Sequence, residues 1–241
     1  MEVMQSCPPL DGRLTLAASF LRPGEPICDV GTDHAYLPLW LLLNGRIPFA
    51  AATDVHEAPL ARARENAARW GCADRISFFL ADGVADVPLG QLGIRQIMIC
   101  GMGGELIARI LENAPYTRAP GVRCILQPMS SAGDLRAALA RDGYRIEDER
   151  IADAAGKLYP CLCVSYDGVI RSPSPVQILI GEANLSRGAA AGPVYAEYLR
   201  REARSVRKRR DGLAAGGHNT AEEDALLGAL AAAAEKEGII L

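Results

Sequence analysis

Residues 27–37, Ile-Cys-Asp-Val-Gly-Thr-Asp-His-Ala-Tyr-Leu, have the pattern around which the predicted fold is built. Residues 27–30 form a short apolar run behind a proline, as expected of a buried strand. Gly31 then allows a tight turn, and Asp33 and His34 stand directly before an apolar helical pattern at residues 35–43. A strand, a glycine turn and a helix start together bring backbone N–H groups to a ligand. The stretch therefore predicts a binding loop.

Strands and helices continue to alternate along the chain. Further strands are predicted at residues 48–55, 76–81, 94–100 and 122–126, and helices at 10–21, 58–70, 104–113 and 131–142. Residues 144–152 and 158–165 are typical of an antiparallel pair joined by a turn. This order predicts an α/β fold, a Rossmann-like and mostly parallel sheet with one antiparallel strand and helices on both faces.

Polar residues follow the predicted strands at their carboxyl ends. Ligands of such sheets bind beyond these ends, so the site is expected there. Each strand contributes at least one such residue: Asp29, Gly31 and Asp33 from the first, Asp54 from the second, Asp82 from the third, residues 101–104 (Gly-Met-Gly-Gly) from the fourth and Gln127 from the fifth.

The acids at this edge favour a cationic ligand over a phosphate. Asp33 occupies the place of the second glycine of a dinucleotide-binding turn, where a carboxylate would repel a pyrophosphate. Asp54 is placed to accept hydrogen bonds from a ribose, and Asp82 from an adenine amino group. The pattern fits S-adenosylmethionine, which has a sulfonium, an ammonium and no phosphate. The alternative is that these acids are ordinary turn residues and helix caps.

Two features of the edge have more than one interpretation. His34 either caps the following helix, contacts the carboxylate of the donor, touches the substrate, or is simply satisfied within the turn. The glycines at 101–104 are either a structural turn or a place where the backbone approaches a ligand closely.

The last seventy residues differ in character from the rest. A Ser-Pro-Ser-Pro linker at residues 172–175 precedes a helix at 193–213, and a second helix begins at Thr220 after a Gly-Gly break. We expect a helical hairpin or coiled-coil extension, and domain boundaries of 1–170 for the sheet domain and 171–241 for the helical domain.

A basic run lies on the first of these helices. Residues 200–210 hold seven bases and one acid, whereas the rest of the chain holds 19 bases and 28 acids. The asymmetry suggests a polyanionic partner such as RNA, and the alternative is a solvated helix face with internal ion pairs. The bases are Arg200, Arg201, Arg204, Arg207, Lys208, Arg209 and Arg210.

Composition limits the remaining possibilities. The chain has 241 residues, 49% of them hydrophobic, and a net charge of −3. The seven cysteines form no Cys-x-x-Cys pair and there are only three histidines, so we expect reduced, buried thiols and no metal site. No apolar run is long enough to span a membrane and residues 1–21 show no signal pattern, so a cytoplasmic location is expected.

Four segments together resemble one family. Residues 29–38 (Asp-Val-Gly-Thr-Asp-His-Ala-Tyr-Leu-Pro), 101–104, 126–128 (Leu-Gln-Pro) and 156–159 (Gly-Lys-Leu-Tyr) are similar in order and spacing to the bacterial tRNA (adenine-22-N1)-methyltransferase family. The resemblance implies a class I methyltransferase that uses S-adenosylmethionine to methylate N1 of an adenine in tRNA. One departure is Met129, where family members often carry asparagine.

The resemblance also implies roles for particular residues. Asp33 is expected to stabilise developing positive charge, with Gln127 and Tyr159 positioning the base, since N1 has its own lone pair and needs alignment more than a base catalyst. The donor site is expected to comprise Asp29, Gly31, His34, Asp54, Asp82, Gly83, Gly101 and Met102. Two other functions stay open: a non-catalytic RNA- or nucleotide-binding protein, and a methyltransferase for a small molecule or protein.

Overall fold

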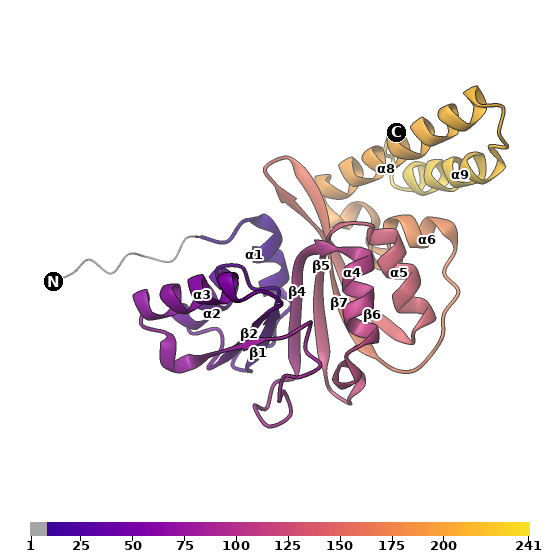
Figure 1. Ribbon diagram of the computed structural model, residues 1–241. Coiled ribbons are helices and arrows are strands. Elements are labelled where there is room, and N and C mark those ends of the chain that lie inside the picture. Colours follow the sequence, from indigo (N-terminus) through magenta and orange to yellow (C-terminus); the bar gives the residue numbers. More distant parts are fainter. Residues whose placement is uncertain (1–8) are drawn as a thin grey trace.

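A seven-stranded sheet with helices on both faces forms the body of the computed structural model, which describes residues 9–241 (Figure 1). The strand order is β3-β2-β1-β4-β5-β7-β6. Neighbours from β3 to β5 are parallel, and β7 is antiparallel to both β5 and β6, which confirms the expected sheet. The strands are β1 (Ile27–Val30), β2 (Ala50–Asp54), β3 (Ile76–Leu80), β4 (Gln96–Gly103), β5 (Arg123–Ser130), β6 (Tyr144–Ala154) and β7 (Lys157–Tyr166).

Each face of the sheet has its own apolar core. On one face, α1 (Gly12–Ser19), α2 (Tyr36–Leu43) and α3 (Glu57–Arg69) cover residues such as Ile27 and Met98. On the other face, α4 (Gly104–Glu112) and α5 (Ala132–Arg141) cover residues such as Ile97 and Leu126. Because β1, β2 and β4 are buried on both sides, they are mostly apolar, and their polar residues lie at or next to a strand end.

Strands β4 and β5 extend further than the sequence predicts. The glycines of residues 101–104 resemble a turn, but parallel pairing continues from Cys100↔Gln127 to Met102↔Pro128 across a register shift. Gly101, at a φ of 81°, takes the irregular position in this shift, where a side chain would be strained. The Gly-Met-Gly and Gln-Pro-Met segments therefore lie side by side as strand ends.

Three helices begin without a side-chain cap. Ser131 precedes α5 but has a φ of 52°, and its side chain makes no capping hydrogen bond. Thr220 precedes α9 (Ala221–Lys236), and its hydroxyl bonds to the Asp224 carboxylate instead of a backbone N–H. His34 does not cap α2 either, because Ala35 in a left-handed conformation is the residue before that helix.

The C-terminal helices form a hairpin that stands on the end of the sheet (Figure 1). Short helices α6 (Pro175–Ile180) and α7 (Glu182–Arg187) lead to the antiparallel pair of α8 (Pro193–Ala215) and α9, which confirms the predicted extension. A third apolar core contains Tyr198, Val206 and Leu230 from this hairpin together with Leu158 from β7. The domain boundary at residues 170 and 171 stays a prediction.

A buried polar junction joins the hairpin to the sheet domain. Arg136 on α5 and Glu149 on β6 form a fully buried ion pair. The Arg136 guanidinium also donates to the carbonyls of Ile178 and Leu179 at 2.8 Å each and to the Tyr198 hydroxyl at 3.3 Å. One arginine thus links α5, β6, α6 and α8. Among the helices of residues 9–241, none is long and apolar enough to cross a membrane.

Candidate functional site

The three sheet-edge aspartates lie on adjacent strands but in different environments. Asp29 is only 7% exposed, and burial raises the pKa of its carboxyl to about 6. The Asp54 carboxylate at the end of β2 is half-buried and accepts a hydrogen bond from the backbone N–H of His56 at 2.8 Å. Asp82, just beyond β3, is exposed. A gradient from buried to exposed carboxylate therefore runs along the carboxyl ends of β1, β2 and β3.

Close packing explains two of the glycines in this loop region. Gly31 has a φ of 76°, and a Cβ added there would lie 2.0 Å from the terminal methyl carbon of Met102. Gly83 has a φ of 70°, and its Cβ would lie 2.9 Å from Cγ2 of Ile110. Met102 thus closes over the first glycine turn and brings the end of β4 against the end of β1.

Asp33 and His34 lie on the outer side of the same turn. The Asp33 carboxylate is 3.7 Å from Nη1 of Arg62 and 3.3 Å from Nε2 of His34, and its side chain is 67% exposed. The His34 ring stacks on Tyr36 with centroids 5.1 Å apart. Within residues 9–241, no hydrogen bond or ion pair joins Asp33 to Gln127 or Tyr159, whereas Arg13 contacts both of the latter.

Gln127 is fully buried, and its amide is engaged inside the protein. Its Oε1 accepts from the backbone N–H of Gly101 at 3.2 Å and from Nη1 of Arg13 at 3.1 Å, while Nε2 donates to the Pro128 carbonyl at 2.8 Å. The amide therefore fixes the ends of β4 and β5 relative to each other and has no atom turned to a base. Its expected role in positioning the base stays a prediction.

Arg13, on α1, contacts two of the candidate site residues, and the sequence does not single it out. Its guanidinium contacts Gln127 and lies 5.6 Å from the ring centroid of Tyr159. A separation of 114 residues from Gln127 leaves no local pattern that could reveal this contact.

Two exposed apolar side chains flank the second and third acids. Val55, directly after Asp54, is 52% exposed, and Leu80, which pairs with Asp54, is 61% exposed. Exposed apolar groups beside hydrogen-bonding carboxylates suit a flat ring with a polar edge. The sequence offers one signal for Val55, an apolar residue immediately after the acid assigned to a ribose.

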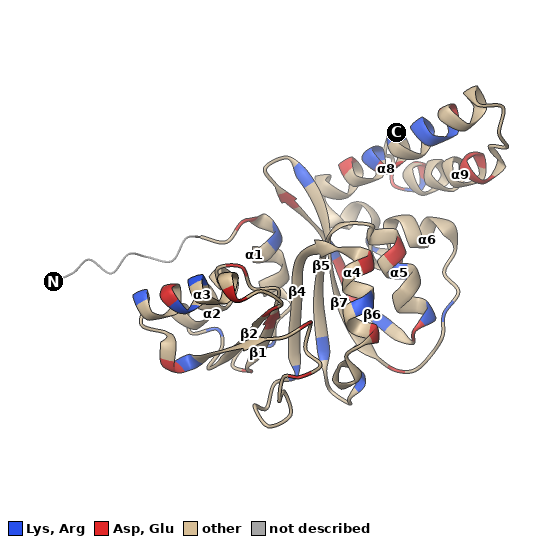
Figure 2. Ribbon diagram, viewed as in Figure 1, with Lys and Arg blue, Asp and Glu red and all other residues tan. Residues whose placement is uncertain are grey.

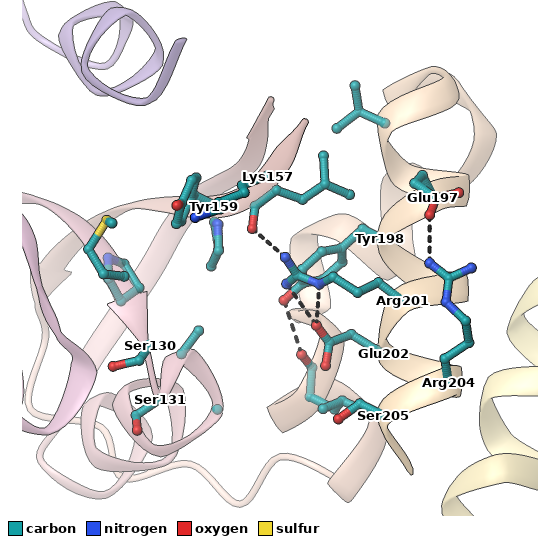
Figure 3. A pocket seen from close by; sticks show the side chains of 18 of the residues that line it. Ser130, Ser131, Lys157, Tyr159, Glu197, Tyr198, Arg201, Glu202, Arg204 and Ser205 are labelled. Carbon is teal, nitrogen blue, oxygen red and sulfur yellow. Dashed lines mark hydrogen bonds and ion pairs between the residues drawn. The ribbon is translucent and has the colours of Figure 1, made fainter. Parts of the chain in front are cut away.

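A large cleft lies between the sheet and α8 (Figure 3). Its volume is about 1490 Å³, and it begins at Pro128 and Met129, directly after Gln127. Tyr159 and Lys157 line it from β7, and residues of α8 face them across the gap (Figure 3). Of the residues assigned to catalysis and donor binding, Tyr159 lines this cleft, whereas the acids of β1, β2 and β3 lie outside its lining.

The basic run is partly neutralised by acids in space. Glu197 pairs with Arg200 and Arg204 rather than with Arg201, whose partner is Glu202. Helix α8 carries seven bases and three acids, whereas α9 carries one base and four acids (Figure 2). Arg209 and Arg210 also reach acids, whereas Arg207 and Lys208 are exposed and make no ion pair within residues 9–241.

The described cysteines are free thiols, as predicted, whereas Cys7 lies outside the described residues. Burial raises the pKa of Cys161 and of Cys163 to about 12, so both are protonated and unreactive at neutral pH. No group of three histidine, cysteine or acidic side chains able to hold a metal ion occurs among residues 9–241.

The sheet order, the glycine turn without a pyrophosphate cradle and the row of carboxylates define a class I methyltransferase. A methyltransferase-domain family model matches residues 10–162. The tRNA (adenine(22)-N(1))-methyltransferase of Bacillus subtilis is 32% identical over 195 residues, which is 78% of this chain and 75% of that protein. This chain belongs to the tRNA (adenine(22)-N1)-methyltransferase family.

Solved structures agree over nearly the whole length, including the C-terminal helices. The B. subtilis m1A22 tRNA methyltransferase superposes with a TM-score of 0.76 at 27% identity and covers 96% of this chain and 99% of its own. Sp1610 of Streptococcus pneumoniae, solved in complex with S-adenosyl-L-methionine, has a TM-score of 0.78 at 32% identity and covers 93% and 99% of the two chains.

Proposed function

We propose that this chain methylates N1 of adenine 22 in tRNA with S-adenosylmethionine as the donor. The main support for this proposal is that a candidate donor site and a candidate base site lie next to each other. The carboxylate edge of the sheet and the cleft under α8 adjoin at the ends of β4 and β5, where Gly101 and Gln127 are hydrogen-bonded. A donor at the edge and a base in the cleft would approach each other there.

The donor side uses the residues of the sheet edge. S-adenosylmethionine supplies a methyl group on a positively charged sulfur. We assign Asp54 to the ribose hydroxyls, Asp82 and Gly83 to the adenine edge, and Val55 to the adenine face. The tight Gly31 turn under Met102 fits a ligand that approaches the backbone without phosphates. The proposed donor site also includes Asp29, His34 and Gly101. Asp33 belongs to it as well, because its exposed carboxylate suits the ammonium group of the donor.

The base side uses Tyr159 as a platform. Its ring lines the cleft, and a purine turned out of the tRNA would stack on it. The N1 lone pair forms the new bond to carbon as the sulfur–carbon bond breaks, so no proton leaves and the positive charge moves to the base. Rate then depends on alignment, and Gln127 contributes by fixing the strand ends rather than by touching the base.

We assign the tRNA backbone to α8. Lys208 lies one helical turn beyond Arg204, which lines the cleft, and Arg207 is beside it. Phosphates would meet these free cations first and compete with Glu197 and Glu223 for the paired arginines. A tRNA substrate also accounts for the expected cytoplasmic location.

The proposal is tested with the full chain, labelled donor and unmodified tRNA transcripts, followed by nucleoside analysis. We expect 1-methyladenosine in a transcript with adenine 22 and none when that position is guanosine. Donor binding by calorimetry without transfer to any tRNA would support the non-catalytic alternative. Transfer of label to protein or small molecules but not to tRNA would support the other alternative.

A further inference from the structure

Arg13 connects the donor edge to the cleft. Its Nη1 shares the Gln127 Oε1 acceptor with the backbone N–H of Gly101, at 3.1 Å and 3.2 Å respectively. On its other side, the guanidinium lies 5.6 Å from the centroid of the Tyr159 ring. One side chain therefore contacts the two residues that the proposed function places on the base side.

The direction of this guanidinium is fixed by Asp11. Nε and Nη2 of Arg13 donate to Oδ2 of Asp11 at 2.9 Å and 2.6 Å, and the other carboxylate oxygen accepts from the N–H of Leu14 at 3.0 Å as the cap of α1. Partial burial would raise the pKa of Asp11, but the hydrogen bonds from Leu14 and Arg13 lower it below its ordinary value. Asp11 is therefore ionised at neutral pH and balances the arginine charge.

The first turn of α1 is itself immobilised against the sheet. A Cβ on Gly12 would lie 2.1 Å from the carbonyl oxygen of Asp153 on β6, and Ala17 and Ala18 are buried in the core. The backbone carbonyl of Arg13 also contacts the Cys161 thiol on β7 at 3.7 Å. The position of Arg13 is thus set by packing around it.

We propose that Arg13, oriented by Asp11, is a positioning residue that holds the Gln127 amide and the Tyr159 ring in the positions required for methyl transfer. This inference rests on the proposed function. The reaction needs alignment rather than a base catalyst. Loosening of the Arg13 contacts with Gln127 and Tyr159 should therefore slow methyl transfer without weakening the binding of the donor or of the tRNA. The Asp11 carboxylate keeps the pair neutral, so Arg13 does not oppose the positive charge that the base acquires.

A double-mutant cycle tests the proposal with Arg13→Met, Gln127→Met and both together. The control is Arg22→Met, an arginine of the same N-terminal segment that instead contacts Glu25 and the Gly121 carbonyl. For each protein we would measure kcat and KM for tRNA, the donor Kd by calorimetry, and the urea midpoint. Asp11→Asn retains the cap of α1 but removes the negative charge, so it shows how much of the loss in kcat depends on the charge of Asp11.

We expect Arg13→Met to lower kcat by roughly 10- to 100-fold, the scale of a misplacement of about 1 Å, with donor Kd and tRNA KM within about threefold of wild type. The double variant should be no slower than the worse single variant, and Arg22→Met should match wild type. An unchanged kcat, additive losses, or a change in KM alone would overturn the role of Arg13. Absence of 1-methyladenosine with the wild-type protein would instead overturn the proposed function.

Discussion

Replacing Asp29 with asparagine should stabilise the free protein at neutral pH while weakening donor binding. Burial raises the pKa of this carboxyl to about 6, whereas an aspartate in the unfolded chain titrates near 4. Between these values the folded state holds a proton that the unfolded state has released, so stability falls as pH rises through the interval. Two pKa units correspond to about 3 kcal/mol.

The stabilisation by Asp29→Asn should increase with pH. The difference in unfolding free energy between Asp29→Asn and wild type should grow from about 0.5 kcal/mol at pH 4 to about 3 kcal/mol at pH 7.5, because only the wild type carries a buried charge at the higher pH. Urea unfolding of both proteins at several pH values measures this difference, and other titrating groups cancel in it. A pH-independent difference would refute the assignment of a buried, strained carboxylate.

The affinity of the wild-type protein for the donor should rise with pH, whereas its stability contribution from Asp29 falls. If the cationic donor binds the ionised form of Asp29, wild-type Kd should be about tenfold weaker at pH 5 than at pH 7.5, given a pKa of about 6. Asp29→Asn should bind weakly at both values and lose this dependence. Calorimetry with S-adenosylmethionine measures it, and an Asp29→Asn protein with wild-type affinity would show that Asp29 does not bind the donor.

Three further variants, the last of them a double substitution, test other parts of the molecule. Gly31→Ala, with a φ of 76° and a Cβ 2.0 Å from a methionine methyl, should cost about 1–3 kcal/mol in urea unfolding and weaken donor binding, unlike an alanine at an open glycine. Glu149→Leu leaves Arg136 buried without a counterion and should cost about 3–5 kcal/mol, whereas loss of an exposed pair should cost little. Neutralising Arg207 and Lys208 should raise the KM for tRNA and reduce its logarithmic salt slope by about 2 with kcat unchanged; an unchanged slope would exclude phosphate contact there.

The sheet and its row of acids were predictable because their signals are local. A buried parallel strand is mostly apolar along its length, so Asp29, one residue before the end of β1, and Asp54, the last residue of β2, mark the ends of these strands without any knowledge of their neighbours. Parallel order then brings these ends to one edge. The same local logic misplaced the end of β4, because a glycine in a paired but irregular strand has the same sequence signature as a glycine in a turn.

Contacts over long distances could not be predicted in this way. Gln127 stands at a strand end, and its sequence position suggests an amide free to read a base. Whether the amide is free depends on Arg13, whose approach is decided by the packing of α1 on β6 and β7. The basic run was visible, but its neutralisation by Glu223 and Asp224 depends on the fold of the hairpin.

The buried Arg136–Glu149 pair gives the C-terminal hairpin a fixed place despite a proline-rich linker. A linker at residues 172–175 alone would let the hairpin move, and the cleft would have no constant width. The guanidinium opposes this motion, because it donates to carbonyls of α6 and to the Tyr198 hydroxyl of α8, and these hydrogen bonds would be lost if the hairpin moved away. Leu158 packs into the hairpin core and, like Tyr159 beside it, lines the cleft. Because Leu158 and Tyr159 are consecutive residues of β7, anchoring of the hairpin through Leu158 also restrains the backbone that carries the Tyr159 ring.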